Sequence, residues 1–217
     1  TSWDAARFEV PAHKWADLSQ GDYGVALLND AKYGHKIKGN VIDLNLLRSV
    51  PYPGSSLLHP TDVAPGEPNH GFTDQCDHVF TYALYPHAGD AVAGGVIRAG
   101  YALNVPLRVV PLEAATGGVA DRAGAPQSTF VQIDAPNVIV EAVKKAEDTA
   151  DIIVRLYESE HRAAKATLWF GFPVAAVREV NLLERPIQLL PVDDDTVTVE
   201  FGPFEVKTLA VTPMSRR

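Results

Sequence analysis

The sequence has little of several features that would assign it to a specialised class of protein. It contains 1 Cys among 217 residues, which excludes a framework of internal disulfides and a zinc site built from several thiolates. No run approaches the roughly 20 apolar residues that a membrane helix needs. Lys and Arg number 19 against 27 Asp and Glu, and this acidic balance argues against binding to phosphate backbones. We therefore expect no nucleic acid and no membrane as partners, while a neutral ligand such as a sugar remains open.

Recognisable catalytic motifs are also missing. No Gly-x-Ser-x-Gly turn and no glycine pattern of a phosphate-binding loop occurs. The seven histidines are scattered, without the i, i+4 spacing of a helical zinc site. We predict no catalytic residue and no metal ligand in this chain. The densest patch of ligand-capable side chains lies in a proline-rich stretch, where a polar loop is the plainer interpretation: Asp62, His70, Asp74, Cys76, Asp77 and His78.

Patterns typical of strands recur along the chain. Ile42, Leu44 and Leu46 alternate with polar residues, as they do in a strand with one buried face. Other segments are β-branched or aromatic runs of strand length. Together they predict an all-β chain of short antiparallel strands in sandwich-like layers. The predicted strands cover residues 42–46, 80–85, 138–147, 152–157, 166–170, 196–201 and 204–209, and a turn is expected at 193–195.

Two stretches interrupt this pattern. Residues 51–78 carry five prolines and little alternation, which predicts a long loop. Residues 112–127 are rich in Ala and Gly and are the best candidate for a linker. We therefore place a domain boundary there, with a larger β unit over residues 1–125 and a smaller one over residues 126–217.

Polar and aromatic residues gather where one apolar strand ends. Ala26-Leu27-Leu28 is followed at once by Asn29, Asp30, Lys32 and Tyr33. Hydrogen-bonding groups beside a flat apolar ring suit a hydroxyl-rich ligand. The alternative is a plain turn, in which Asn29 and Asp30 bond locally and a following glycine takes a positive φ. The residues alone leave both interpretations open.

Several long blocks of the sequence resemble the C-terminal β region of glycoside hydrolase family 38, the α-mannosidases, in the form found in its bacterial and cytosolic members. The matching blocks occur in the same order as in the family and extend over nearly the whole chain, from about residue 3 to residue 213. The blocks that carry it are FEVPAHKWADLS (8–19), GVALLNDAKYG (24–34), LNLLRS (44–49), FTYALYPH (80–87) and FGPFEVKT (201–208).

This resemblance implies a mutarotase-like antiparallel β-sandwich, incomplete here, followed by a smaller β-sandwich. Family members are retaining enzymes that hydrolyse terminal α-D-mannosides with a zinc ion and an aspartate nucleophile in an N-terminal catalytic domain. No block of this chain matches those parts. The resemblance therefore implies a non-catalytic C-terminal portion whose partner is the catalytic domain of the same polypeptide. Asn29, Asp30, Lys32 and Tyr33 are the expected contacts to the α-mannoside.

Two other classes of function stay open. A free-standing carbohydrate-binding module would present an exposed aromatic platform and bind mannose by itself. A sugar epimerase-like enzyme would use a His and a Glu as general base and acid. We expect a cytoplasmic location, to which the single cysteine adds weak support, and formation of a homo-oligomer is left open.

Overall fold

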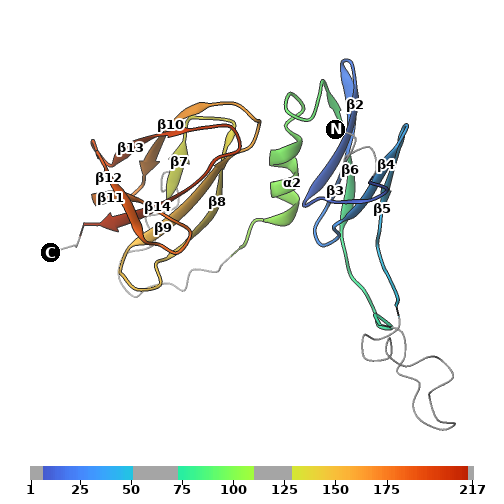
Figure 1. Ribbon diagram of the computed structural model, residues 1–217, viewed down its shortest axis with the longest axis horizontal. Coiled ribbons are helices and arrows are strands. Elements are labelled where there is room, and N and C mark those ends of the chain that lie inside the picture. Colours follow the sequence, from blue (N-terminus) through green and yellow to red (C-terminus); the bar gives the residue numbers. More distant parts are fainter. Residues whose placement is uncertain (1–6, 51–72, 110–128, 215–217) are drawn as a thin grey trace, which may run out of the picture. The chain divides into compact units, whose positions relative to one another are not determined.

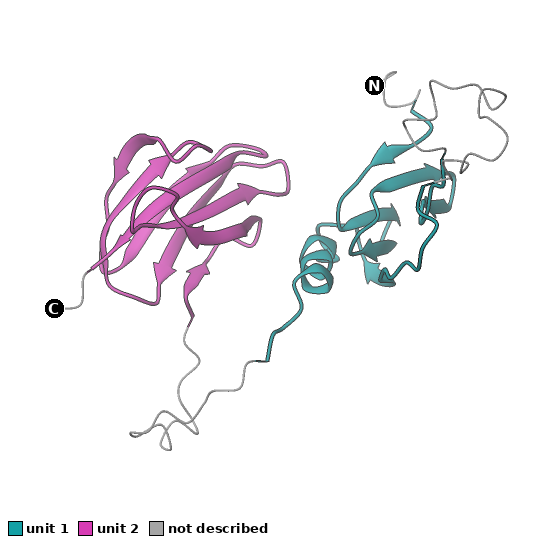
Figure 2. Cartoon of the chain, turned by 90° about the horizontal axis from the view of Figure 1, so that it is seen from below, with its two compact units in different colours: residues 1–110 teal, residues 111–217 magenta. Residues whose placement is uncertain are grey.

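The computed structural model describes residues 7–50, 73–109 and 129–214, and it divides the chain into two compact units, 1–110 and 111–217 (Figures 1 and 2). Every strand pairing in those ranges is antiparallel, which confirms the predicted all-β class. The predicted boundary after residue 125, the linker over 112–127 and most of the loop over 51–78 fall outside the described ranges. The boundary therefore stays a prediction.

The main sheet of unit 1 is covered on one face by a helix that the sequence patterns did not predict. The sheet has the order β2-β3-β6, and the helix α2 spans Val96–Asn104. Val96 of this helix is buried against Ala26 and Leu28 of the central strand, with Trp15 packed beside them. This contact forms the small core of unit 1. The strands are β2 (Trp15–Gln20), β3 (Tyr23–Asn29) and β6 (Tyr82–Ala88).

The second sheet of unit 1 follows directly from the turn that ends β3. It has the order β1-β4-β5. The alternation that predicted a strand over 42–46 is realised only up to Leu44. His35, the second residue of β4, is buried, and its side chain contacts Asn29 at the end of β3. The strands are β1 (Val10–Pro11), β4 (Gly34–Lys38) and β5 (Val41–Leu44).

Unit 2 is a sandwich of two antiparallel sheets. One sheet has the order β13-β10-β7 and the other the order β12-β11-β14-β9-β8. The segment that begins at Val138 is a strand, as predicted, and β7, β11 and β12 are strands that the patterns missed. The strands are β7 (Val131–Ile133), β8 (Val138–Lys145), β9 (Ile152–Glu158), β10 (Ala164–Phe170), β11 (Val174–Val180), β12 (Pro186–Leu190), β13 (Thr196–Phe201) and β14 (Val206–Pro213).

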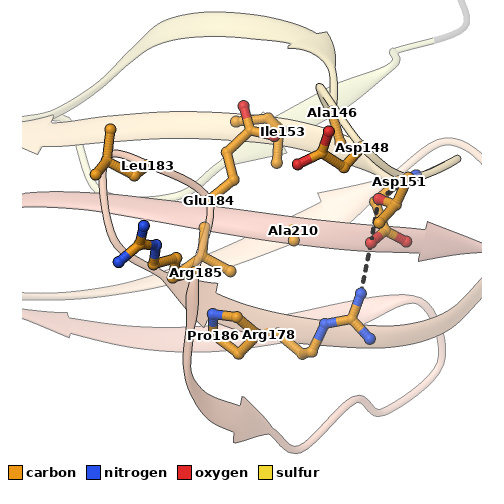
Figure 3. Close-up of a pocket in the computed structure, with 12 residues that line it drawn as sticks. Ala146, Asp148, Asp151, Ile153, Arg178, Leu183, Glu184, Arg185, Pro186 and Ala210 are labelled. Atoms are coloured by element: carbon orange, nitrogen blue, oxygen red, sulfur yellow. Dashed lines mark hydrogen bonds and ion pairs between the residues drawn. The ribbon is translucent and has the colours of Figure 1, made fainter.

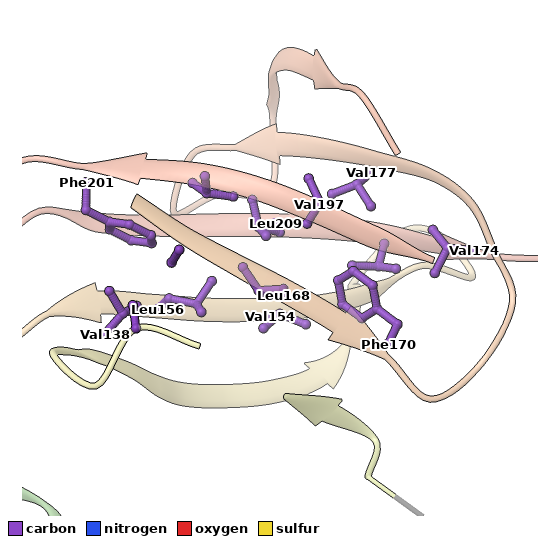
Figure 4. Packing of buried hydrophobic residues seen from close by; sticks show 14 residues of the cluster. Val138, Val154, Leu156, Leu168, Phe170, Val174, Val177, Val197, Phe201 and Leu209 are labelled. Carbon is purple, nitrogen blue, oxygen red and sulfur yellow. The ribbon is translucent and has the colours of Figure 1, made fainter. Parts of the chain in front are cut away.

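The core of unit 2 lies between the two sheets (Figure 4). On β10 the residues Ala166, Leu168 and Phe170 point inward, while Trp169 between them is exposed. Leu156 and Leu209 approach from the opposite sheet. The period of two along each strand therefore separates a buried face from a solvated one. The predicted turn at 193–195 joins β12 to β13, and Asp194 and Asp195 adopt the positive φ that a tight turn requires.

A buried carboxylate ties the loops at one end of this sandwich. Glu158 is 0% exposed and accepts hydrogen bonds from Asn137 Nδ2 at 2.9 Å and from the backbone N–H of Phe204 at 2.9 Å and Glu160 at 2.8 Å. Burial by itself would raise the pKa of Glu158, but these donors hold it below its usual range. The charge thus joins the loop after β9 to the loop before β14.

In the part of the chain that the structure describes, no helix is long and apolar enough to cross a membrane.

Candidate functional site

The turn that follows β3 is built around Asn29. This residue is 1% exposed, and its Oδ1 accepts a hydrogen bond from the backbone N–H of Lys32 at 2.8 Å. Its Nδ2 lies 3.4 Å from Nε2 of the buried His35, and its backbone oxygen accepts a bond from Asn104 Nδ2 at 2.9 Å. Asn29 therefore holds the turn through local hydrogen bonds, as the turn interpretation predicted. The positive φ that this interpretation expected at the following glycine, Gly34, is wrong, because Gly34 begins the extended strand β4. Its contact with a sugar stays a prediction.

Asp30 is exposed and extends the pairing between β3 and β6 by one residue. Its Oδ1 accepts a hydrogen bond from the backbone N–H of Thr81 at 2.9 Å, and its own N–H donates to Thr81 O at 3.2 Å. The bond from Thr81 holds the pKa of Asp30 below its usual value. The carboxylate of Asp30 is thus charged at neutral pH. Its direction is fixed because it bonds to the backbone of Thr81, next to the paired ends of β3 and β6.

Lys32 and Tyr33 complete this surface together with aromatic rings from other segments. The ammonium group of Lys32 lies over the ring of Phe80, 4.9 Å from its centroid. Tyr33 is 53% exposed and its ring lies 4.7 Å from that of His13. Phe80 in turn stacks on Tyr82 with centroids 6.5 Å apart. The result is a surface of two ring pairs around one ammonium and one carboxylate, which we call the strand-end cluster: His13, Asp30, Lys32, Tyr33, Phe80 and Tyr82.

The strand-end cluster offers what recognition of a sugar needs. Exposed rings provide flat apolar faces, while Asp30 and Lys32 provide an acceptor and donors for hydroxyl groups. Its charges oppose one another, so it selects neither anions nor cations strongly. Sequence reasoning found Asp30, Lys32 and Tyr33 but missed His13, Phe80 and Tyr82. The register that pairs Asn29 with Tyr82 places Phe80 and Tyr82, and the only signal for it was the predicted strand over 80–85. His13 comes beside Tyr33 through the bond from the N–H of Ala12 to Tyr33 O.

A second polar cluster lies in the same unit, on the helix-covered side of the sheet. His87 Nε2 is 2.7 Å from Asp17 Oδ1, both side chains are almost fully buried, and Ser19 donates to the other oxygen of Asp17. The hydrogen bond with Asp17 raises the pKa of His87. Gly94 lies so close to the His87 ring that a Cβ there would be 2.2 Å from Nδ1. Because these groups are enclosed, this cluster stabilises the sheet and offers no open site.

The ligand-capable side chains of the described residues do not converge on one point. Over residues 7–50, 73–109 and 129–214, no three His, Cys, Asp or Glu side chains come together in a way that could hold a metal ion. Of the ligand-capable patch in the proline-rich stretch, Asp62 and His70 lie outside these ranges. Within the rest, His78 Nε2 bonds to Asp74 O at 2.9 Å and lies 3.7 Å from Cys76 Sγ, which is local hydrogen bonding within a loop.

Two family models match the chain, one in each unit. Residues 1–56 match the "Glycosyl hydrolases family 38 C-terminal domain", and residues 137–209 match the "Glycosyl hydrolases family 38 C-terminal beta sandwich domain". The first match contains Asn29, Asp30, Lys32 and Tyr33, and the second covers most of the sandwich of unit 2. The fold and the matched segments thus define the C-terminal β region of a glycosyl hydrolase.

Similar proteins agree with this class. The chain is 36% identical over 214 residues to Alpha-mannosidase 2C1 of Homo sapiens and 38% identical over 216 residues to Alpha-mannosidase G of Dictyostelium discoideum. Both alignments cover 96% of this chain but only 18% of the relative. The crystal structure of an alpha-mannosidase from Enterococcus faecalis V583 has the same fold, with a TM-score of 0.65, 18% identity, and coverage of 93% of this chain and 21% of that one. The chain therefore belongs to glycosyl hydrolase family 38 and corresponds to the C-terminal region of its α-mannosidases.

Proposed function

We propose that this chain is the non-catalytic C-terminal part of an α-mannosidase that hydrolyses terminal α-D-mannosides with retention, and that its strand-end cluster forms part of the wall of the substrate cleft. In this role Asp30, Lys32 and Tyr33 contact mannose hydroxyls or the neighbouring catalytic domain. Asn29 positions them by holding the turn after β3. The observation that carries the proposal is the cluster itself, a partly exposed group of rings and opposite charges at a strand end, whose Asp30, Lys32 and Tyr33 lie within the family-matched segment.

The exposed apolar surface of unit 1 supports the existence of a partner domain. Leu84 is 72% exposed, and Tyr23 and Tyr82 are more than half exposed on the same face of the β2-β3-β6 sheet, opposite α2. Large apolar side chains gathered on one sheet face are typical of a surface that another domain covers. Since the relatives are more than five times longer than the matched segment, the catalytic domain of the same polypeptide is the partner we propose.

The chemistry of bond cleavage belongs, in this proposal, to the preceding part of the polypeptide. The described residues of this chain offer no set of three metal ligands. We propose that a zinc ion and an aspartate nucleophile are held by the catalytic domain, where the zinc ion would bind sugar hydroxyls and the aspartate would supply the nucleophile of a retaining mechanism. The contribution of unit 1 is then binding and orientation.

We also propose a cytoplasmic location and a role in mannose metabolism. Cys76, the single cysteine, is exposed and forms no disulfide, as suits a thiol in a reducing compartment. Fractionation of cells that express the tagged full-length enzyme tests the location, and recovery in a membrane or secreted fraction would contradict it.

The test of the cleft proposal is kinetic and uses the full-length enzyme. Replacing both Asp30 and Lys32 by Ala should raise KM or lower kcat at least tenfold, which corresponds to about 1.4 kcal/mol of transition-state stabilisation. The matched control replaces Lys36 and Asp43, an exposed pair that faces each other across β4 and β5 of the same unit. The control variant should retain full activity. Equal kinetics of the two double variants would remove Asp30 and Lys32 from the cleft.

A further inference from the structure

The outer face of the five-stranded sheet of unit 2 holds a cavity of about 630 Å³. Its floor is apolar: Ile153 of β9, Val180 of β11 and Ala210 of β14 are buried and pack on one another, apart from the sandwich core. In Figure 3, Asp148 and Asp151 lie on one side of Ile153 and Ala210, and Leu183 and Arg185 lie on the other. The cavity is therefore a trough with an apolar base and two charged walls.

One wall is held rigid by a buried carboxylate. Asp151 accepts hydrogen bonds from Thr212 Oγ1 at 2.6 Å and Thr149 Oγ1 at 2.9 Å, and its Oδ2 lies 2.5 Å from Arg178 Nη2. Burial by itself would raise the pKa of Asp151, but Thr212, Thr149 and Arg178 hold it below its usual value. The guanidinium of Arg178 is about one-third exposed and keeps further N–H donors beyond the one that Asp151 binds. Asp151 thus orients Arg178 at the edge of the cavity.

The opposite wall is fixed in a similar way. Glu184 lies 2.8 Å from Lys144 Nζ, and its other oxygen accepts the backbone N–H of Glu147 at 2.8 Å. The loop that carries Glu184 is closed by Asn181, whose Oδ1 accepts the N–H groups of Leu183 and Arg185. Both walls are thus ordered without a ligand, which lowers the entropic cost of binding one.

Two charged groups at the cavity keep their hydrogen-bonding capacity. Across residues 7–50, 73–109 and 129–214, neither the Asp148 carboxylate nor the Arg185 guanidinium makes a hydrogen bond or an ion pair. The charges that line the cavity nearly balance, since Asp148, Asp151 and Glu184 are opposed by Arg178 and Arg185, and Lys144 beside Glu184 is shared with Glu147. Such a rim attracts neither anions nor cations strongly. It offers acceptors and donors to a neutral ligand that has many hydroxyl groups.

We propose that this cavity is a binding site of unit 2 for a neutral hexopyranose. The C–H face of the sugar ring lies on Ile153, Val180 and Ala210, its hydroxyls donate to Asp148, and they accept from Arg185 and Arg178. The class of ligand follows from the cavity, whereas the choice of mannose rests on the proposed function. Because the floor has no aromatic ring, the expected dissociation constant is weak, on the order of 1 mM.

The experiment is an NMR titration of the 217-residue chain with methyl α-D-mannopyranoside, observing methyl groups of Ile153, Val180 and Ala210. Saturable shifts confined to these methyls are the expected result. Asp148→Asn and Arg185→Ala should each raise the dissociation constant at least threefold, and both together at least tenfold. The controls are Asp194→Asn, at the exposed turn before β13, and Arg108→Ala in unit 1, which should leave the constant unchanged.

Separate arms of the titration distinguish the ways in which the proposal can fail. Saturation by methyl α-D-glucopyranoside but not by the mannoside keeps the sugar site and removes its link to mannose. Inorganic phosphate that shifts the same methyls more strongly than either sugar would overturn it in favour of an anion site. The proposal would also be overturned if no sugar caused a saturable shift at concentrations up to about ten times the expected dissociation constant. None of these results depends on catalysis, so the kinetic test of the strand-end cluster stays independent.

Discussion

The two units bury very different amounts of apolar side chain, although each holds about half of the chain. Among the residues that the structure describes, the main cluster of unit 2 has 14 buried members, whereas that of unit 1 has Ala26, Leu28 and Val96. Unit 2 closes its core between its own two sheets. Unit 1 covers one face of its main sheet with α2 and leaves Leu84 exposed on the other. The comparison indicates that unit 2 is stable by itself, while unit 1 depends on a further surface for part of its stability.

The largest expected effect compares two leucines that lie on strands, one in each unit. Leu168 of β10 is 0% exposed within the core of unit 2, so Leu168→Ala should cost about 2–5 kcal/mol of the free energy of unfolding of that unit. Leu84→Ala, which removes an exposed side chain from unit 1, should change stability by less than about 0.5 kcal/mol. Urea unfolding of the 217-residue chain, followed through methyl signals of Leu156 and Leu28, reports the two units separately. Equal losses from both substitutions would break the comparison.

A smaller effect concerns the buried charge of unit 2. Glu158→Gln replaces a carboxylate that accepts N–H groups from three segments, two on each oxygen, so two N–H groups would then face the amide NH2 of the glutamine. Since hydrogen bonds to charged groups are the stronger ones, we expect a loss of about 1.5–3 kcal/mol in unit 2. Glu200→Gln on the exposed face of β13 is the control, because its partner Lys165 is 3.8 Å away on the surface. The same urea experiment measures both variants, and a Glu158 variant as stable as the control would contradict the structural role.

The smallest effect is a difference between the two units in the sign with which their stability depends on pH. The hydrogen bond with Asp17 raises the pKa of His87 above 6.5, so its contribution to unit 1 is complete below pH 6.5 and is lost as the pH rises through the raised value. In unit 2, burial opposes ionisation of Glu158 and Asp151, but their donors lower the pKa below 4.5 and 3.8. Their contribution is present above those values and is lost as the pH falls through the lowered ones.

Urea midpoints of the Leu28 and Leu156 signals between pH 3 and pH 9 test this difference. We expect the midpoint of unit 1 to fall on the alkaline side, and His87→Gln to abolish that fall. The midpoint of unit 2 should fall on the acid side in both proteins. A parallel pH profile of the two units would show that His87 and the buried carboxylates do not control it.

Strands could be predicted from the sequence where alternation or β-branched runs were dense. Thr196–Phe201 and Ile152–Glu158 are of this kind, and both are strands. The helix Val96–Asn104 was missed because its own residues signal it weakly: it begins after Gly95, which has a positive φ and makes no side-chain cap, and its first turn has no acidic residue. Packing of Val96 on Ala26 and Leu28 stabilises it instead. β12 was missed because it begins with a proline and is exposed along almost its whole length.

The candidate site divides in the same way. The polar turn after β3 is contiguous in the sequence, so Asp30, Lys32 and Tyr33 could be named in advance. Phe80 and Tyr82 come from a segment about fifty residues further on, and only the register of β3 with β6 places them beside Lys32. The cavity of unit 2 had no sequence signal, because its floor and walls come from four strands and two loops.

By itself the sequence determined the all-β class and the polar turn after β3, because the period of two and turn chemistry are local properties of neighbouring residues. Tertiary structure alone decided which strands pair, where α2 forms and which side chains meet in the strand-end cluster and in the cavity. Those outcomes depend on contacts between residues far apart in the chain, whose free energies no local pattern contains.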